Sequence, residues 1–147
     1  MNNNTLTAAN SIITISIADL YPVAQRLQGF AADNITDIDS SNSVETSMGV
    51  DGRLSGGFIH AAITQNVHLQ ADSMSCVLFE NWEAAQRTSR EVYIATGTII
   101  LPATKRKYAL TRGFLTTPSR MPSIGKTLQA RRWTITWESI SASPYGG

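Results

Sequence analysis

The chain has 147 residues, of which 42% are hydrophobic and 16% are charged, and its formal net charge is +1. This is the composition of one globular domain with a real core, and the balanced charge gives no reason to expect a nucleic-acid or membrane partner. The lone cysteine, Cys76, excludes an internal disulfide, and no apolar run reaches the roughly 18 residues of a membrane helix. Residues 1–10 are polar and predict a flexible lead without the features of a signal peptide.

Alternation of apolar and polar residues predicts mostly β-strands. Ile13, Ile15 and Ile17 share one face of a first strand. Residues 21–30 are ambiguous, and the acidic stretch 31–43 reads as a loop. Residues 44–50 and 58–70 alternate as two more strands, and the apolar run 92–101 fits a strand covered on both sides. Residues 107–116 and 127–138 complete the set, the last with Trp133 and Trp137 on one face.

A glycine-rich stretch joins the strands predicted at 44–50 and 58–70. It contains two turn signals, Asp51-Gly52 and Gly56-Gly57, where a tight hairpin needs only one. The sequence therefore predicts a long, flexible arm in which the glycines permit sharp turns and Leu54 is an apolar anchor. An ordinary surface loop is the alternative interpretation, because one exposed leucine is unremarkable.

One segment, residues 72–87, breaks the β pattern with helical spacing. Asp72 is a suitable N-cap, and Arg87 suits the last turn of a helix. The apolar face predicted to pack on the sheet consists of Met74, Val77, Leu78 and Trp82. A single helix cannot cover both faces of a parallel sheet, so the predicted fold is mainly β: an antiparallel sandwich or barrel with one helix outside. We expect one domain over residues 11–140 and a flexible tail over 141–147.

No catalytic, cofactor or metal site emerges from the motifs. The run "SIGKT" at 123–127 resembles the end of a phosphate-binding loop, but Arg120 stands where that motif needs a glycine, and a strand follows instead of a helix. His60 and His68 lie about 26 Å apart along a strand, too far to share a metal. Asp33, Asp37 and Asp39 lack the glycine and glutamate of a calcium loop. No nucleophile–base pair is visible, so we expect a protein that is not an enzyme and uses no cofactor.

Charge divides unevenly between the two halves of the chain. Residues 1–75 contain seven acidic and two basic residues, whereas residues 76–147 contain ten basic and four acidic ones. Surfaces of opposite sign would let copies of one chain attract each other, although chance clustering on solvated loops is an equal alternative.

The last third of the chain carries a resemblance. The segment "YALTRGFLTTPSRMPSIGKTLQARRWTITWESI", 108–140, is similar to the C-terminal part of tail tube proteins from contractile bacteriophage tails. The shared features are an "LT-x-G" step at Leu110–Gly113, a proline-rich crossing at Pro118 and Pro122, the Gly125-Lys126-Thr127 entry and the strand from Trp133 to Trp137. Upstream, a "DGR" arm at 51–53 and a helix near 74–86 follow the same order, so the resemblance extends over about residues 11–140.

The resemblance implies a structural virion protein with the fold of type VI secretion inner tubes. Copies would form six-membered rings that stack into a hollow tube inside a contractile sheath, assembled in the bacterial cytoplasm. The implied partners are further copies, the sheath and tape measure proteins, DNA in the lumen, and the baseplate and terminator proteins, with no membrane involved. A tail terminator or a tube initiator of the same fold is an alternative, as is a small-ligand-binding barrel.

The resemblance also assigns roles to two groups of residues. The inter-subunit arm would consist of Asp51, Gly52, Arg53, Leu54, Ser55, Gly56 and Gly57. A polar strand suited to the lumen wall would contain Thr64, Gln65 and Asn66.

Overall fold

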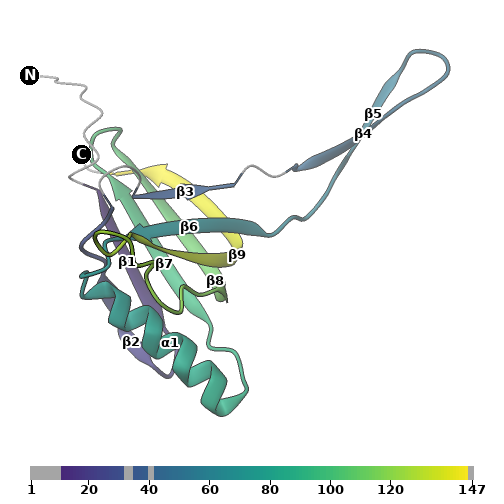
Figure 1. Cartoon of the computed structure of the whole chain (residues 1–147). Helices are drawn as coiled ribbons and strands as arrows, with labels where there is room; N and C mark the ends of the chain where they lie inside the picture. The colour runs from purple at the N-terminus through teal and green to yellow at the C-terminus, as the bar shows by residue number, and fades with distance from the viewer. Residues whose placement is uncertain (1–10, 32–34, 40–41, 146–147) are drawn as a thin grey trace, which may run out of the picture.

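The computed structural model describes residues 11–31, 35–39 and 42–145, which form one antiparallel sheet, one helix and a separate hairpin (Figure 1). The first strands are β1 (Ile12–Ile17), β2 (Tyr21–Arg26), β3 (Thr36–Ile38), β4 (Val44–Met48), β5 (Leu54–Phe58) and β6 (Ile63–Leu69). The elements that follow are α1 (Ser75–Ser89), β7 (Ala95–Leu101), β8 (Arg106–Thr117) and β9 (Arg131–Pro144). The seven-stranded sheet has the order β2-β1-β7-β8-β9-β6-β3, and β4 pairs only with β5.

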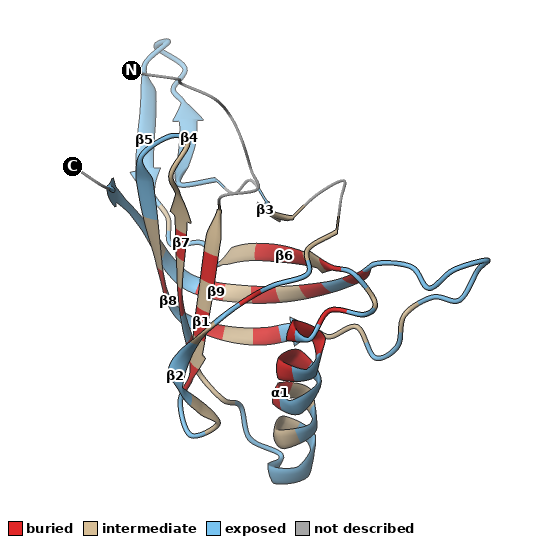
Figure 2. Cartoon of the chain, turned by 90° about the vertical axis from the view of Figure 1, so that its left-hand side faces the viewer, coloured by how far each residue is buried: buried red, intermediate tan, exposed pale blue. Residues whose placement is uncertain are grey.

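The sheet curls around the core without closing. Its end strands, β2 and β3, do not pair with each other in the part of the chain that the structure describes. Figure 2 shows the β6–β9 end running across the β1–β7–β8 end, with buried residues between them and α1. The predicted mainly β, antiparallel fold with one helix packed outside is therefore confirmed, in the form of an open, sandwich-like sheet.

The core forms where one face of the sheet meets α1. Alternation in β1 and in residues 131–137 of β9 buries every second side chain, as the sequence predicts. Phe79 of α1 stacks on Trp133 of β9, with 5.0 Å between ring centroids. The other large buried side chains are Ile17, Leu27, Leu69, Trp82, Leu110, Ile135 and Trp137.

The helix α1 differs from its prediction in its start and in the face that it buries. It begins at Ser75, and Met74 occupies the N-cap without a side-chain hydrogen bond, so Asp72 does not cap it. Leu78 and Trp82 are buried, as predicted, but Met74 and Val77 are 86% and 53% exposed. Cys76 and Phe79 are buried instead, because the buried stripe is centred nearer to Phe79 than the sequence pattern indicates.

Several strand limits also differ from the sequence prediction. Residues 36–38, expected in a loop, form β3 and pair with β6. The strand expected from residue 92 begins at Ala95, and exposed Thr96 shows that it is not covered on both faces. Residues 141–144, expected in a flexible tail, pair with the start of β8, because backbone hydrogen bonds can hold a Ser/Ala-rich segment without apolar side chains. Asp33 and residues 1–10, for which the sequence made predictions, lie outside the described residues.

Candidate assembly surfaces

The hairpin β4–β5 projects away from the rest of the molecule (Figure 1). Every residue of both strands is exposed. The strands pair from Val44 opposite Phe58 to Met48 opposite Leu54. The hairpin therefore keeps its shape through its own ladder while burying no side chain in the chain's core.

The two faces of this hairpin have opposite character. Val44, Met48, Leu54 and Phe58 lie on one face, because they alternate with Glu45, Ser47, Ser55 and Gly57 on the other. The four apolar side chains are 49%, 64%, 63% and 71% exposed. We call them the hairpin's apolar face. An amphipathic hairpin is expected to lie on a second surface, and here its apolar side faces solvent.

The tip of the hairpin is a short ordered turn. The Gly49 amide donates to the Arg53 carbonyl (2.8 Å), and the Gly52 amide donates to the Gly49 carbonyl (3.0 Å). Asp51 Oδ1 accepts from the Arg53 amide, and Gly52 adopts φ +85°, a conformation that glycine favours. Of the predicted arm, only residues 51–53 belong to the turn, whereas Leu54–Gly57 lie in β5. The predicted flexible arm is thus an ordered hairpin, because Gly56 and Gly57 are strand residues rather than a second turn.

A groove of about 640 Å³ lies where the hairpin leaves the body. Phe58 and His60 form one wall and pack edge to face, with 4.8 Å between ring centroids. Ile63, Glu138 and Ile140 contribute the side that belongs to the sheet. The groove continues the exposed apolar character of the hairpin to β6 and β9 of the sheet.

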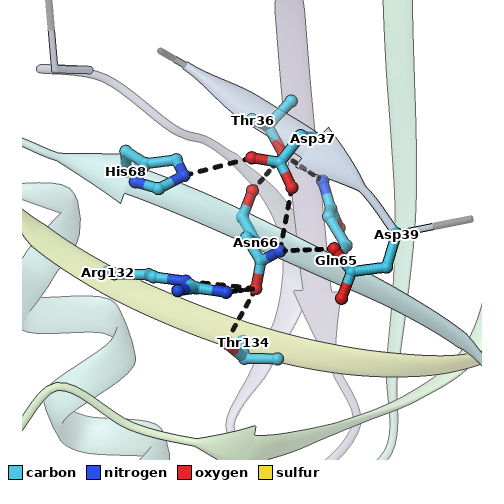
Figure 3. Close-up of polar contacts among 8 residues, drawn as sticks. All are labelled: Thr36, Asp37, Asp39, Gln65, Asn66, His68, Arg132 and Thr134. Atoms are coloured by element: carbon cyan, nitrogen blue, oxygen red, sulfur yellow. Dashed lines mark hydrogen bonds and ion pairs between the residues drawn. The ribbon is translucent and has the colours of Figure 1, made fainter. Parts of the chain in front are cut away.

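A satisfied polar network fills the outer side of β6 (Figure 3). Asn66 is 2% exposed and lies at its centre. Its Nδ2 donates to Asp37 (2.8 Å) and Asp39 (3.1 Å), both from the β3 segment. Its Oδ1 accepts from Arg132 Nη2 (2.9 Å) and Thr134 Oγ1 (3.0 Å), both from β9. One buried amide therefore joins three strands.

Gln65 performs a related role on the core side of β6. It is 1% exposed, and its Oε1 accepts from Trp137 Nε1 at 2.9 Å. Its Nε2 donates to Thr36 Oγ1 at 3.0 Å. Gln65 and Asn66 of the predicted lumen strand are thus buried in the single chain, because β3 and β9 supply partners that cover them. Thr64 is partly exposed.

Hydroxyl side chains cover the sheet face that points away from the core. Three pairs bond across neighbouring strands: Ser16 with Thr96 at 2.7 Å, Thr116 with Thr136 at 3.1 Å, and Thr111 with Ser139. They alternate with buried residues such as Ile17 and Ile135. We call these six residues the hydroxyl face. It is a broad polar surface that β1, β7, β8 and β9 share, and the charged Lys107 and Arg132 lie on the same side of the sheet.

The β8–β9 loop, residues 118–130, is a second protrusion, and its base is fixed to α1. Buried Arg131 bonds to the Ser119 carbonyl and to Glu80 of α1, and its guanidinium lies 4.7 Å from the Trp133 ring centroid. Farther out, Met121, Ile124 and Leu128 are 66%, 72% and 56% exposed. We call these three side chains the loop patch. The "SIGKT" segment is part of this loop and opens no helix, as expected.

Reactive groups are few in the described residues. No group of three or more His, Cys, Asp or Glu side chains there could hold a metal ion. Burial raises the pKa of the Cys76 thiol, and the nearby Arg131 charge only partly opposes this shift. A buried, protonated thiol is inert, so Cys76 acts as a small packing residue. Among the same residues, no helix has the length and apolar character to cross a bilayer.

The comparisons identify the family of this chain. Residues 4–141 match the model of a family described as tail fiber protein gp32, so the chain belongs to that family. No curated protein matches the chain significantly. Family membership makes it a structural component of a phage-type tail and not an enzyme, as the sequence indicates.

Solved structures share the fold at low sequence identity. A chain in the anti-feeding prophage tube-terminating cap has a TM-score of 0.61 and 11% identity over 95% of this chain and 91% of that chain. A chain in the sheath–tube complex of an extracellular contractile injection system, PVC, has a TM-score of 0.59 and 15% identity over 90% and 88%. A chain in the anti-feeding prophage baseplate has a TM-score of 0.58 and 8% identity over 91% and 92%. The fold is thus one that contractile-system components use.

Proposed function

We propose that this chain is a ring-forming subunit of the tail tube of a contractile phage tail. Copies associate into rings, six to a ring, and the rings stack within a sheath around a lumen that carries the tape measure protein and then DNA. Assembly takes place in the host cytoplasm, and baseplate and terminator proteins bind the two ends. The finished protein is part of the virion.

The observation that carries this proposal is the uncovered β4–β5 hairpin. A two-stranded hairpin is marginally stable alone, and one with an exposed apolar face gains stability when a partner covers that face. The predicted inter-subunit arm, residues 51–57, supplies its tip and one of its strands. We infer that the hairpin reaches a neighbouring copy, where its apolar face is buried.

The hydroxyl face suits the lumen wall better than the buried strand that the sequence suggested. Its hydroxyl groups are neutral and already bond to one another across strands. The open sheet ends, β2 and β3, leave backbone groups that neighbouring copies in a ring could cover.

A cap or terminator ring is the second candidate. It is favoured by the similarity to a chain of the tube-terminating cap and to a chain of the PVC sheath/tube terminator, the latter with a TM-score of 0.52. A cap would form a ring but would stop further stacking. Ring formation is common to both candidates, and only growth along the axis distinguishes them.

Electron microscopy of the purified chain, alone and with its sheath partner, tests the proposal. We expect rings that stack into tubes, whereas single rings that do not stack would favour the cap. The variant Leu54→Ser/Phe58→Ser should abolish assembly, because it removes half of the hairpin's apolar face. Ser47→Ala/Ser55→Ala, on the opposite face, is the matched control and should assemble normally. Normal tubes from the Leu54→Ser/Phe58→Ser variant would refute the role of the hairpin.

A further inference from the structure

The loop patch is a second apolar surface that nothing in the described chain covers. Met121, Ile124 and Leu128 are each more than half exposed, although the loop that carries them is ordered. Ile124 and Leu128 form a β-bridge, and the Gln129 amide donates to the Ser123 carbonyl at 2.9 Å. The three side chains are therefore displayed on a small, structured tip.

Two arginine side chains fix the base of this loop to α1. Arg131 is 4% exposed and joins the loop at Ser119 to Glu80 of α1. Arg120 lies 3.5 Å from Glu83, one helical turn farther along α1. A preorganised loop loses little conformational freedom on binding, which favours a docking role.

Charges around the two exposed apolar surfaces differ in sign. The hairpin carries Glu45 and Asp51 against the single basic residue Arg53. The loop carries Lys126 and Arg120, the latter paired with Glu83 of α1, and residues 118–130 contain no acidic residue. The attraction between an acidic hairpin and a basic loop would guide two copies into one orientation.

We propose that the loop patch of one copy receives the apolar face of the β4–β5 hairpin of another copy. The inference rests on the proposed function, in which copies assemble through the hairpin, and it names the surface that accepts it. The two surfaces lie on separate protrusions, so one molecule can donate its hairpin and accept another at the same time. Such a head-to-tail contact either closes a ring or extends a filament, depending on its rotation.

Each contact of this kind is small. The hairpin ladder is about 17 Å long, and its apolar face meets only three side chains of the loop. Stable pairwise interfaces bury more than about 1,000 Å² in total, so one hairpin–loop contact forms a weak dimer. Several contacts in a closed assembly act together, and assembly should therefore have a sharp concentration threshold.

Cross-linking between two different single-cysteine chains tests the contact. In a Cys76→Ala background, Leu54→Cys chains and Ile124→Cys chains are mixed, allowed to assemble and oxidised. We expect disulfide-linked dimers between the two chain types. Leu54→Cys mixed with Val92→Cys is the control and should stay uncross-linked, because Val92 is 64% exposed but lies between α1 and β7, away from the loop patch. Equal cross-linking in both mixtures, or none in the first, would overturn the proposal.

Charge exchange gives a second measurement. Lys126→Glu and Asp51→Lys should each raise the concentration needed for assembly about two- to fivefold, and the double variant should restore it. Simple additivity of the two single effects in the double variant would refute a direct pairing of these protrusions.

The two proposals, that the hairpin drives assembly and that the loop patch accepts it, fail in different ways. Normal assembly of Leu54→Ser/Phe58→Ser would show that the hairpin has no role, and both proposals would fail. The variant Ile124→Ser/Leu128→Ser removes most of the loop patch. If this variant assembles normally while Leu54→Ser/Phe58→Ser does not, a surface other than the loop patch accepts the hairpin.

Discussion

Gly113 of β8 lies directly against the indole of Trp137 of β9, its partner across the sheet. A methyl group at Gly113 would lie 2.4 Å from Cε3 of Trp137, closer than carbon atoms can approach. The preceding residue, Arg112, has φ 50° and marks an irregular step in β8. The "LT-x-G" step seen in the sequence therefore makes room for a core tryptophan.

Gly113→Ala should destabilise the chain by about 1–3 kcal/mol, because Trp137 is fully buried and must shift. Urea denaturation followed by tryptophan fluorescence measures the change. Gly57→Ala, where nothing lies within 4 Å of the added methyl group, is the control and should stay within about 0.5 kcal/mol of wild type. Equal effects of the two substitutions would contradict the steric explanation.

Trp82→Ala should cost about 3–5 kcal/mol of unfolding free energy, because the side chain is buried between α1 and the sheet. It also removes a hydrogen bond from Trp82 Nε1 to the Tyr93 carbonyl (3.3 Å). Thermal and chemical unfolding give the value. Val77→Ala, on the exposed side of the same helix, should change stability by less than about 0.5 kcal/mol. A loss below about 1 kcal/mol for Trp82→Ala would mean that this part of the core is poorly packed.

Asn66→Leu should destabilise the chain by about 1–3 kcal/mol, although leucine is similar in size and more apolar. The loss arises because Arg132, Thr134 and two carboxylates lose a bonding partner. Hydrogen exchange should show the loosening first in β3, which is short and lies at the sheet's end. Thr88→Leu, at an exposed position near the end of α1, is the control. Unchanged protection of β3 would show that its backbone pairing suffices.

Because of Cys76, the unfolding free energy should fall as pH rises in the alkaline range. Its pKa is raised in the folded chain, mainly by burial, so the unfolded chain ionises first as pH rises above the ordinary thiol pKa of about 8.5. Below that pH the thiol is protonated in both states and has no effect. The unfolding free energy of wild type minus that of Cys76→Ala should therefore decrease as pH rises from neutral to above pH 9. A constant difference would contradict the burial of this thiol.

Much of the body could be predicted from the sequence because its core follows a simple period. Ile13, Ile15 and Ile17 in β1, and Trp133 and Trp137 in β9, are buried as their alternation indicates. Leu78 and Trp82 are buried as their helical spacing indicates. These positions depend on local geometry, which repeats along the chain.

The misplaced residues depend on partners that local spacing does not reveal. Gln65 and Asn66 look like surface residues, but Trp137 and Arg132, far along the chain, bury them. Met74 and Val77 are as apolar as core residues, but the position of the helix on the sheet decides which stripe is covered. Gly56 and Gly57 resemble a turn, and only the pairing of β4 with β5 shows that they belong to a strand.

The β4–β5 hairpin contributes no buried side chain to the body, and this separation has an evolutionary consequence. Apart from the turn at Gly52, substitutions within residues 44–58 are released from the requirement to preserve the core, so they can accumulate at little cost in folding. If the hairpin binds a neighbouring copy as proposed, a lineage can therefore change its choice of neighbour while the scaffold stays constant. Exchange of residues 44–58 between relatives should then transfer the preference for a neighbouring subunit, although the segment is smaller than a domain.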